Sequence, residues 1–189
     1  MKRRFVLIAA SLEELASQAP IAARCVSAAL MISHGLRRDT DLVLAVLNGP
    51  SIHFITSKLR SVAPDEASLL GILRKALRAC LELGRLPRTV HSGVAVNLHT
   101  IEHYTAGFPL KFLCSASGVE PRSVFLRARE PAVFLVPLPG SFSDGRRWGA
   151  VELKLPIDRL WPDQVISLIN IILDRWSGCG DLCGFAREG

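Results

Sequence analysis

Two segments of the sequence place basic side chains close to a carboxylate. Two arginines immediately precede Asp39, and both Lys58 and Arg60 precede Asp65. Basic groups favour an anionic partner, and a carboxylate can accept or orient a proton in a reaction. The simpler alternative is that the basic residues form a solvated surface and that the carboxylates cap a helix. Together with apolar, proline-bounded loops near the end of the chain, the pattern favours an acidic polymer that reaches a small buried cofactor.

The sequence contains none of the familiar enzyme motifs. There is no Gly-x-Gly-x-x-Gly, P-loop or Gly-x-Ser-x-Gly segment. His99 and His103 are close enough to share a helix face, but without a third ligand they do not predict a metal site. Cys179 and Cys183 supply fewer ligands than a structural zinc needs, so they predict an ordinary tail or a tail disulfide. We therefore expect no metal.

Composition limits the class of protein. The chain has 189 residues, of which 49% are hydrophobic and 21% charged, as in a globular domain, and a net charge of +6. The apolar run at 5–10 is shorter than the roughly 7–15 residues of a secretory signal, and no run approaches the roughly 20 residues of a membrane span. The odd number of cysteines argues against a secreted disulfide framework. We expect a cytoplasmic protein without membrane contact.

The elements that must position these groups are apolar strands and helices. We expect strands near 5–10, 42–47, 52–56, 94–98, 110–114, 133–136 and 151–155, and helices near 20–32, 65–83, 99–104 and 162–176. The stretch from 117 to 131 predicts no regular element. Strands and helices alternate late in the chain, which is typical of an open parallel α/β sheet whose ligands bind beyond the carboxyl ends of the strands.

The last helix carries the strongest pattern. Its polar positions recur at spacings of four, three and four residues and form one narrow stripe: Asp163, Ser167, Asn170 and Asp174. Most other positions are apolar, whereas a surface helix of a monomer has a broad polar face. The helix is therefore either the central helix of the domain, or it is covered by the sheet on one side and by a second subunit on the other. The second alternative predicts a dimer.

Four segments together resemble the archaeal tRNA pseudouridine N1-methyltransferases of the SPOUT superfamily. They are RCVSAA at 24–29, SHGLRRD at 33–39, VAPDE at 62–66 and RKAL at 74–77. The resemblance extends, with gaps, from 5 to 176. It implies an α/β fold with a mostly parallel sheet whose carboxyl-terminal part forms a trefoil knot. It also implies a single domain over 1–189, with RNA-facing basic loops in 1–90, the cofactor-binding knot in 91–176 and a tail at 177–189.

The resemblance implies a function as well. A homodimer with its site at the subunit boundary would use S-adenosylmethionine to methylate N1 of pseudouridine at position 54, in the T arm of tRNA. The implied cofactor contacts are Leu113, Val136, Pro137, Leu138, Gly140, Leu153, Lys154, Leu155, Pro156, Ile157 and Val165. The candidate phosphate contacts are Arg24, Arg37, Arg38, Lys58 and Arg60. Two positions depart from the family pattern: Pro137 replaces a glycine and Val165 replaces a cysteine.

Methylation requires the N1 proton to leave as N1 attacks the methyl group. Asp65 is the candidate proton acceptor and Asp39 the reserve; the alternative for Asp65 is a purely structural place at a helix start. Two rival functions resemble the first: N1-methylation of a pseudouridine in small-subunit ribosomal RNA, and non-catalytic RNA binding by the same fold. Composition alone would also allow a ligand-binding α/β domain unrelated to RNA.

Overall fold

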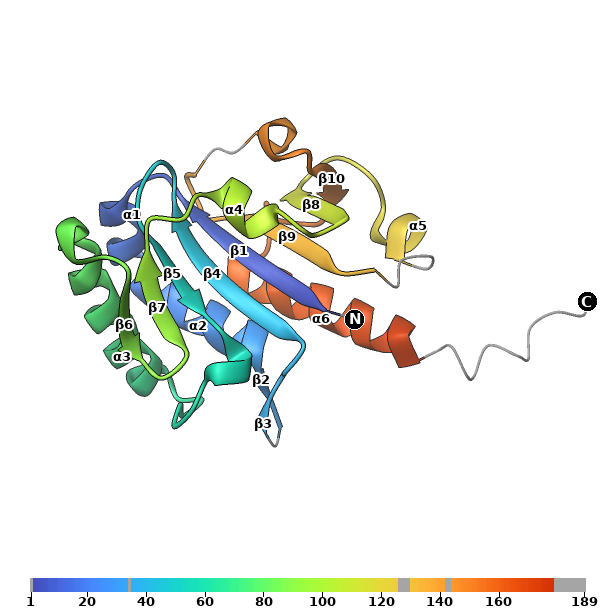
Figure 1. The fold of residues 1–189 in the computed structure, drawn as a ribbon. Helices are drawn as coiled ribbons and strands as arrows, with labels where there is room; N and C mark the ends of the chain where they lie inside the picture. The colour runs from blue at the N-terminus through green and yellow to red at the C-terminus, as the bar shows by residue number, and fades with distance from the viewer. Residues whose placement is uncertain (1, 34, 126–129, 142–143, 179–189) are drawn as a thin grey trace, which may run out of the picture.

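An eight-stranded sheet forms the centre of the molecule, with the strand order β10-β8-β9-β1-β4-β5-β7-β6 (Figure 1). The computed structural model describes residues 2–33, 35–125, 130–141 and 144–178. The strands of this sheet are β1 (Arg3–Ala9), β4 (Thr40–Val46), β5 (Ser51–Phe54), β6 (Arg88–His91), β7 (Val94–Asn97), β8 (Leu110–Ser115), β9 (Ala132–Pro137) and β10 (Val151–Lys154). The pairs from β10 to β4 are parallel, and those from β4 to β6 are antiparallel. The predicted mostly parallel α/β sheet is confirmed.

The central strands are buried on both faces, which explains their almost continuous apolar sequence. In β1, every residue from Phe5 to Ala9 is fully buried, and β9 is buried from Ala132 to Val136. Helices cover both sides of a parallel sheet, so neither face of its strands needs polar residues.

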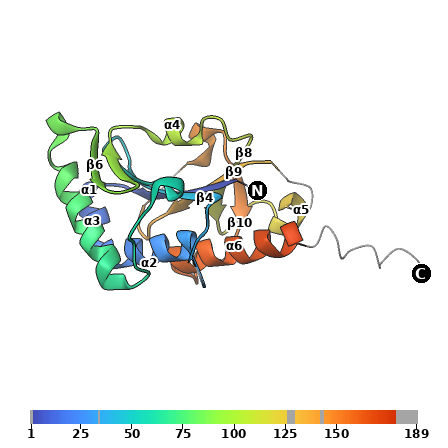
Figure 2. The same cartoon turned by 60° about the horizontal axis from the view of Figure 1, so that its bottom comes forward.

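Helices cover the two faces unequally (Figure 2). One face carries α1 (Leu12–Ser17), α2 (Ala19–Leu30), α3 (Glu66–Cys80) and α6 (Pro162–Gly178). The other face carries α4 (Ile101–Thr105) and the 3-10 helix η3 (Gly145–Trp148). Short elements complete the chain: the hairpin β2 (Met31–Ile32) and β3 (Gly35–Leu36), α5 (Pro121–Phe125), and the 3-10 helices η1 (Thr56–Lys58) and η2 (Leu83–Arg85). No helix among the described residues is long and apolar enough to cross a membrane.

The predicted helix at 20–32 was wrong at its end. Helix α2 stops at Leu30, because Met31 adopts an extended conformation and pairs with Leu36 in the hairpin. The sequence analysis also missed α1, α5 and β6. These elements are short, and β6 is an edge strand whose exposed first half gives no apolar signal.

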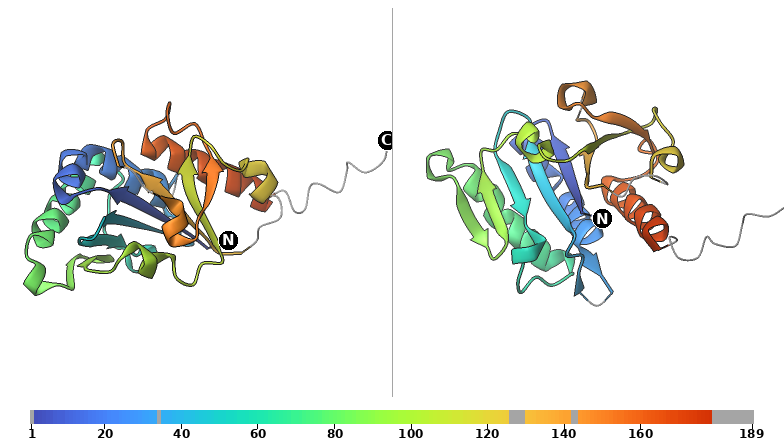
Figure 3. Two further views of the ribbon diagram at one scale, coloured as in Figure 1. Left: turned by 90° about the horizontal axis from the view of Figure 1, so that it is seen from above. Right: turned by 45° about the vertical axis from the view of Figure 1, so that its right-hand side comes forward.

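Helix α6 lies beside α2 (Figure 3). Side chains of its polar stripe contact α2 and the start of β1. Asn170 donates a hydrogen bond to the carbonyl of Ala28 at 3.0 Å and accepts one from Arg3 at 2.8 Å. Asn170, within the stripe, is therefore part of the interior. By contrast, Ile171 is 49% exposed and Trp161, just before the helix, is 51% exposed. Within one chain, α6 is covered over only part of its circumference.

Strand β10 passes between β8 and a segment that follows β8 in the sequence. On one side Leu155 donates its N–H to the carbonyl of Ser115. On the other side Lys154 donates to the carbonyl of Val119, and Val119 donates to the carbonyl of Glu152. Gly118 permits this close passage: it has a φ of +109°, and a Cβ there would overlap the Glu152 carbonyl oxygen.

Candidate cofactor and RNA site

The predicted site residues lie at two opposite edges of the sheet. Asp39 directly precedes β4, and the hydroxyl of Thr56 donates to the carbonyl of Thr40, which holds the 56–65 loop at the same amino-terminal edge. The predicted cofactor loops follow β9 and β10, at the carboxyl-terminal edge. Strands of seven residues such as β1 and β4 rise about 3.3 Å per residue, so the two edges are about 20 Å apart.

Three of the predicted phosphate contacts are exposed at the amino-terminal edge. They are Arg38, Lys58 and Arg60. Arg38 donates to the carbonyl of Thr56 at 3.2 Å, and Arg60 donates to two carbonyls of its own loop. These contacts are to neutral carbonyl oxygens, so each guanidinium keeps its positive charge at the surface. This edge can attract phosphate groups.

The other two predicted phosphate contacts form ion pairs with α6. Arg24 donates to Asp163 at 3.2 Å, and Arg37 donates to both oxygens of Asp174 at 2.7 and 2.9 Å. Each positive charge is therefore already paired with a carboxylate. In this structure the two arginines fasten α6 to the rest of the domain, and their contact with RNA stays a prediction.

Asp65 is the N-cap of α3, as the structural alternative for this residue expects. Its carboxylate accepts the backbone N–H of Ser68 at 2.8 Å. Hydrogen bonds from the side chain and backbone of Ser68 lower the pKa of Asp65, which is exposed. A lowered pKa keeps the group ionised and able to orient a proton, although it makes the carboxylate a weaker base. Its catalytic role stays a prediction.

Asp39 belongs to an ion-pair network at the same edge. Its carboxylate lies 3.5 Å from the guanidinium of the buried Arg3 and accepts the hydroxyl of Thr40 at 3.1 Å. Arg3 also contacts Asp174 at 3.0 Å. These contacts give Asp39 a structural place between β1, β4 and α6, and its reserve catalytic role is likewise untested.

Most of the predicted cofactor side chains are buried in the interior. The buried ones are Leu113, Val136, Leu138, Leu153, Leu155 and Val165. Leu113 packs beneath η3 on the opposite face of the sheet from α6. The remaining positions of the set are more accessible: Pro137 and Ile157 are partly buried, and Gly140, Lys154 and Pro156 are exposed.

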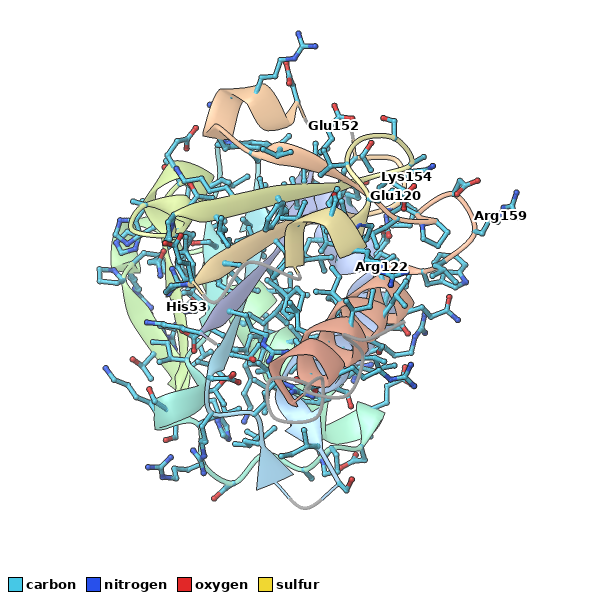
Figure 4. All side chains as sticks on the ribbon, turned by 90° about the vertical axis from the view of Figure 1, so that its right-hand side faces the viewer. His53, Glu120, Arg122, Glu152, Lys154 and Arg159 are labelled. Atoms are coloured by element: carbon cyan, nitrogen blue, oxygen red, sulfur yellow. The ribbon has the colours of Figure 1, made fainter. Side chains whose placement is uncertain are left out.

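A pocket of about 320 Å³ lies beside β10, and three of its residues belong to the predicted cofactor set. Its lining consists of Ala116, Glu120, Lys154, Leu155, Pro156, Asp158 and Arg159. Lys154 and Glu120 form an ion pair of 2.9 Å at its rim, and Arg159 projects from the loop after β10 (Figure 4). Ligand pockets start at about 300 Å³. Apolar and charged groups side by side fit a ligand such as S-adenosylmethionine, which has an aromatic base and a charged amino-acid end.

A buried polar cluster lies on the other face of the sheet. His53 packs edge-on against Tyr104, with ring centroids 5.3 Å apart, and its Nε2 lies 3.9 Å from Asp41. Burial, and then the positive charge of Arg4, lower the pKa of His53 to about 4. The rings of His99 and His103 lie nearby, with centroids 3.9 Å apart and planes tilted by 44°. Among the described residues there is no group of three ligands that could hold a metal.

The sequence analysis missed one carboxylate at the carboxyl-terminal edge. Glu14 contacts Ser141 in the loop after β9. A capping-box spacing, with Ser11 three residues before Glu14, was a readable signal for it. The predicted tail feature, Cys179 and Cys183, lies outside the described residues.

Known proteins resemble this chain over most of its length. A family model described as "Putative SAM-dependent RNA methyltransferase" matches residues 9–107. The tRNA (pseudouridine(54)-N(1))-methyltransferase of Methanosarcina acetivorans is 40% identical over 170 residues, which cover 85% of this chain and 80% of that protein. The chain belongs to this family. Its counterpart from Methanocella arvoryzae is 28% identical over 85% of this chain and 86% of its own length.

A solved structure agrees with the fold of this family member. Nep1 of Archaeoglobus fulgidus, bound to S-adenosylhomocysteine, superposes with a TM-score of 0.65 at 14% sequence identity. The superposition covers 94% of this chain and 100% of that protein. This likeness confirms the SPOUT methyltransferase arrangement of strands and helices.

Proposed function

We propose that this protein is an S-adenosylmethionine-dependent methyltransferase that methylates N1 of pseudouridine 54 in tRNA, and that it acts in the cytoplasm. The observation that carries the proposal is the pocket at the carboxyl ends of β8 and β10, lined by residues of the predicted cofactor set, in a chain 40% identical to a tRNA (pseudouridine(54)-N(1))-methyltransferase. The exposed basic groups at the opposite edge supply the attraction that a tRNA substrate requires.

The separation of the two edges supports a homodimer with a shared site. A proton acceptor must come within about 3 Å of the proton that it takes, and about 20 Å separates Asp65 from the cofactor loops across the sheet of one chain. We therefore propose a dimer in which the basic edge of one subunit meets the cofactor pocket of the other, with the reactive site at the subunit boundary.

The exposed side of α6 supports the same dimer. Positions spaced by three and four residues form a stripe along the helix and the residue before it: Trp161, Gln164, Leu168, Ile171 and Arg175. Two large apolar side chains of this stripe, Trp161 and Ile171, are about half exposed, which is typical of an interaction surface. We expect Ile171→Glu to convert the dimer into a monomer that can be detected by light scattering after gel filtration.

The path of β10 supports a trefoil knot. Strand β8 ends at Ser115 and β9 begins at Ala132, and β10 lies hydrogen-bonded between Ser115 and Val119, which belongs to the connection between these two strands. The chain then continues to α6 on the face beside α2. We propose that this passage of the chain through its own loop is the knot that shapes the cofactor pocket.

The chain's own residues have distinct tasks in the reaction. S-adenosylmethionine, when bound, supplies an electrophilic methyl group on a sulfonium. Pro156 and Ile157 would hold its apolar part, and Lys154 at the pocket rim would face its carboxylate end. Arg38, Lys58 and Arg60 would bind phosphates of the tRNA and bring the turned-out base to the pocket. Asp65 of the partner subunit would orient or accept the N1 proton, while close positioning of the reactants supplies much of the acceleration.

The decisive experiment uses labelled S-adenosylmethionine and three RNA substrates. We expect label in a tRNA transcript with pseudouridine at position 54, and none in the same transcript with uridine there, since uridine has no free N1–H. A small-subunit ribosomal RNA fragment containing pseudouridine is the third substrate. Preferential labelling of that fragment would support the ribosomal alternative, and binding of tRNA without any transfer would support a non-catalytic module.

A further inference from the structure

Glu14 joins helix α1 to the loop that follows β9. Its Oε2 atom accepts the backbone N–H of Ala10 at 2.5 Å and the hydroxyl of Ser141 at 2.6 Å. The Ser141 oxygen also accepts the Ala10 N–H at 3.1 Å. Ala10 follows β1 and Ser141 follows β9, which are neighbours in the sheet. One carboxylate oxygen therefore fixes the carboxyl ends of two adjacent strands relative to each other.

A second contact from the same helix reaches the same loop. Gln18 lies one helical turn after Glu14 and donates from Nε2 to the carbonyl of Pro139 at 3.1 Å. Residues four apart lie on one side of a helix, so α1 supports the loop at two points. The loop also bonds to β1 directly, because Leu138 donates to the carbonyl of Ile8 at 2.8 Å.

Gly140 lies at the centre of this supported loop. Its φ of +90° is a conformation that residues with side chains rarely adopt. A Cβ at this position would lie 3.5 Å from Oε1 of Glu14. The carboxylate therefore lies directly against the turn while its other oxygen bonds to the next residue, Ser141.

Helix capping does not account for these contacts. Ser11 is the N-cap of α1 and accepts the N–H of Glu14 at 3.2 Å. In a capping box, a glutamate at this position bonds back to the N-cap backbone N–H. Glu14 instead bonds to Ala10, outside the helix, and to Ser141, which is 127 residues away in sequence. Its carboxylate serves the loop after β9.

We propose that Glu14 is a positioning residue for the cofactor: it holds the loop at 138–141 in the shape that receives S-adenosylmethionine, without touching the reactants. The inference rests on the proposed function, which assigns this loop to the cofactor. Loss of the carboxylate weakens cofactor binding and leaves RNA binding unchanged, because Glu14 contacts the loop at 138–141, whereas the proposed phosphate contacts are Arg38, Lys58 and Arg60.

The test compares two variants that break the contact between α1 and the loop at 138–141 with a control variant that changes only the cap of α1. Glu14→Ala removes the contacts of the carboxylate with Ala10 and Ser141. Ser141→Ala removes the hydroxyl that donates to this carboxylate. Ser11→Ala is the control, because it removes the cap of the same helix and leaves the loop contacts in place. The measurements are the cofactor Kd by calorimetry with S-adenosylhomocysteine, and the KM values for cofactor and for tRNA.

We expect Glu14→Ala to raise the cofactor Kd and the cofactor KM about tenfold, which corresponds to the loss of one hydrogen bond to a charged group. The KM for tRNA stays at the wild-type value. Ser141→Ala raises the cofactor Kd less, and the double variant is no weaker than Glu14→Ala, because both changes break the same contact. Ser11→Ala lowers the melting temperature and leaves the cofactor Kd unchanged.

Two results would overturn the inference. One is a wild-type cofactor Kd in both Glu14→Ala and Ser141→Ala; the other is an equal loss of affinity in Ser11→Ala. If Glu14→Ala does not fold, Ser141→Ala still decides, since it removes a single hydroxyl from a partly exposed loop. Failure of the wild-type protein to bind S-adenosylhomocysteine would instead reject the proposed function.

Discussion

Mixed dimers can test whether the two edges of the sheet serve one site across the subunit boundary. The first parent carries Arg38→Glu and Lys58→Glu, which reverse the charge of exposed groups at the amino-terminal edge. The second parent carries Gly140→Val, which places a β-branched residue at a φ of +90° in the cofactor loop. Each homodimer lacks one half of every site, so both parents should be inactive.

The expected activity of the mixed dimer follows from its geometry. If the edges, about 20 Å apart in one chain, work together only across the boundary, then each mixed dimer contains one site with an intact basic edge and an intact cofactor loop. Its other site carries both defects. A mixed dimer purified through two different affinity tags should therefore show about half of the wild-type activity, since one of its two symmetry-related sites is complete.

The assay is methyl transfer to a tRNA transcript with pseudouridine at position 54, at saturating cofactor and RNA. If the two edges worked within one chain, every site of the mixed dimer would be defective. Activity as low as that of the two parents would therefore refute the shared site. Circular dichroism of both parents, compared with wild type, controls for loss of folding.

Four further predictions follow from contacts described above. Arg38→Ala should reduce the salt dependence of tRNA binding, measured by filter binding. Arg37→Ala should reduce it less and should also lower the melting temperature, because Arg37 binds Asp174. Arg3→Met should lower the free energy of unfolding in urea by about 2–3 kcal/mol, because it removes the hydrogen bonds to Asn170 and to the carboxylate of Asp174. An unchanged free energy of unfolding would show that water replaces these bonds. The pKa of His53 is about 4 in the folded protein, below its ordinary value of 6.5, so the unfolded chain binds the proton more tightly. The free energy of unfolding should therefore be highest above pH 6.5 and fall by on the order of 3 kcal/mol towards pH 4. The same pH dependence in a His53→Asn variant would contradict this. Gly140→Ala should weaken cofactor binding in calorimetry, and wild-type affinity would show that its φ of +90° is not required.

Periodicity predicted the interior strands and the long helices well. Strands β1, β4 and β9 are continuous apolar runs, because both of their faces are buried. The edge strand β6 gave no such run, since half of it faces solvent. Short helices such as α1 and α5 contain too few residues to display a helical period. Elements that are long or buried on both faces could therefore be predicted from the sequence, whereas short or half-exposed elements could not.

The sequence predicted which residue types form the candidate site, but it did not predict most of the contacts that these residues make. The sequence identified Arg37 as basic, but its pairing with Asp174 joins residues 137 positions apart and depends on the packing of α6. The stripe of Asp163, Asn170 and Asp174 was visible, yet only the fold shows that it faces arginines and the backbone of α2. Glu14 lay beside a readable cap, but its bond to Ser141 depends on the sheet order.

The contact of Arg3 with the last helix bears on how the protein is made. During synthesis β1 emerges from the ribosome before α6, which lies more than 150 residues later. The shortest contacts of the buried Arg3 guanidinium, to Asn170 and Asp174, come from α6, while its contact to Asp39 is longer, at 3.5 Å. A nascent chain interrupted before α6 would keep this cation poorly neutralised beside an uncovered apolar sheet. Chains truncated before α6 should therefore be rapidly degraded in the cell, because β1 is protected only when α6 has been made and packed.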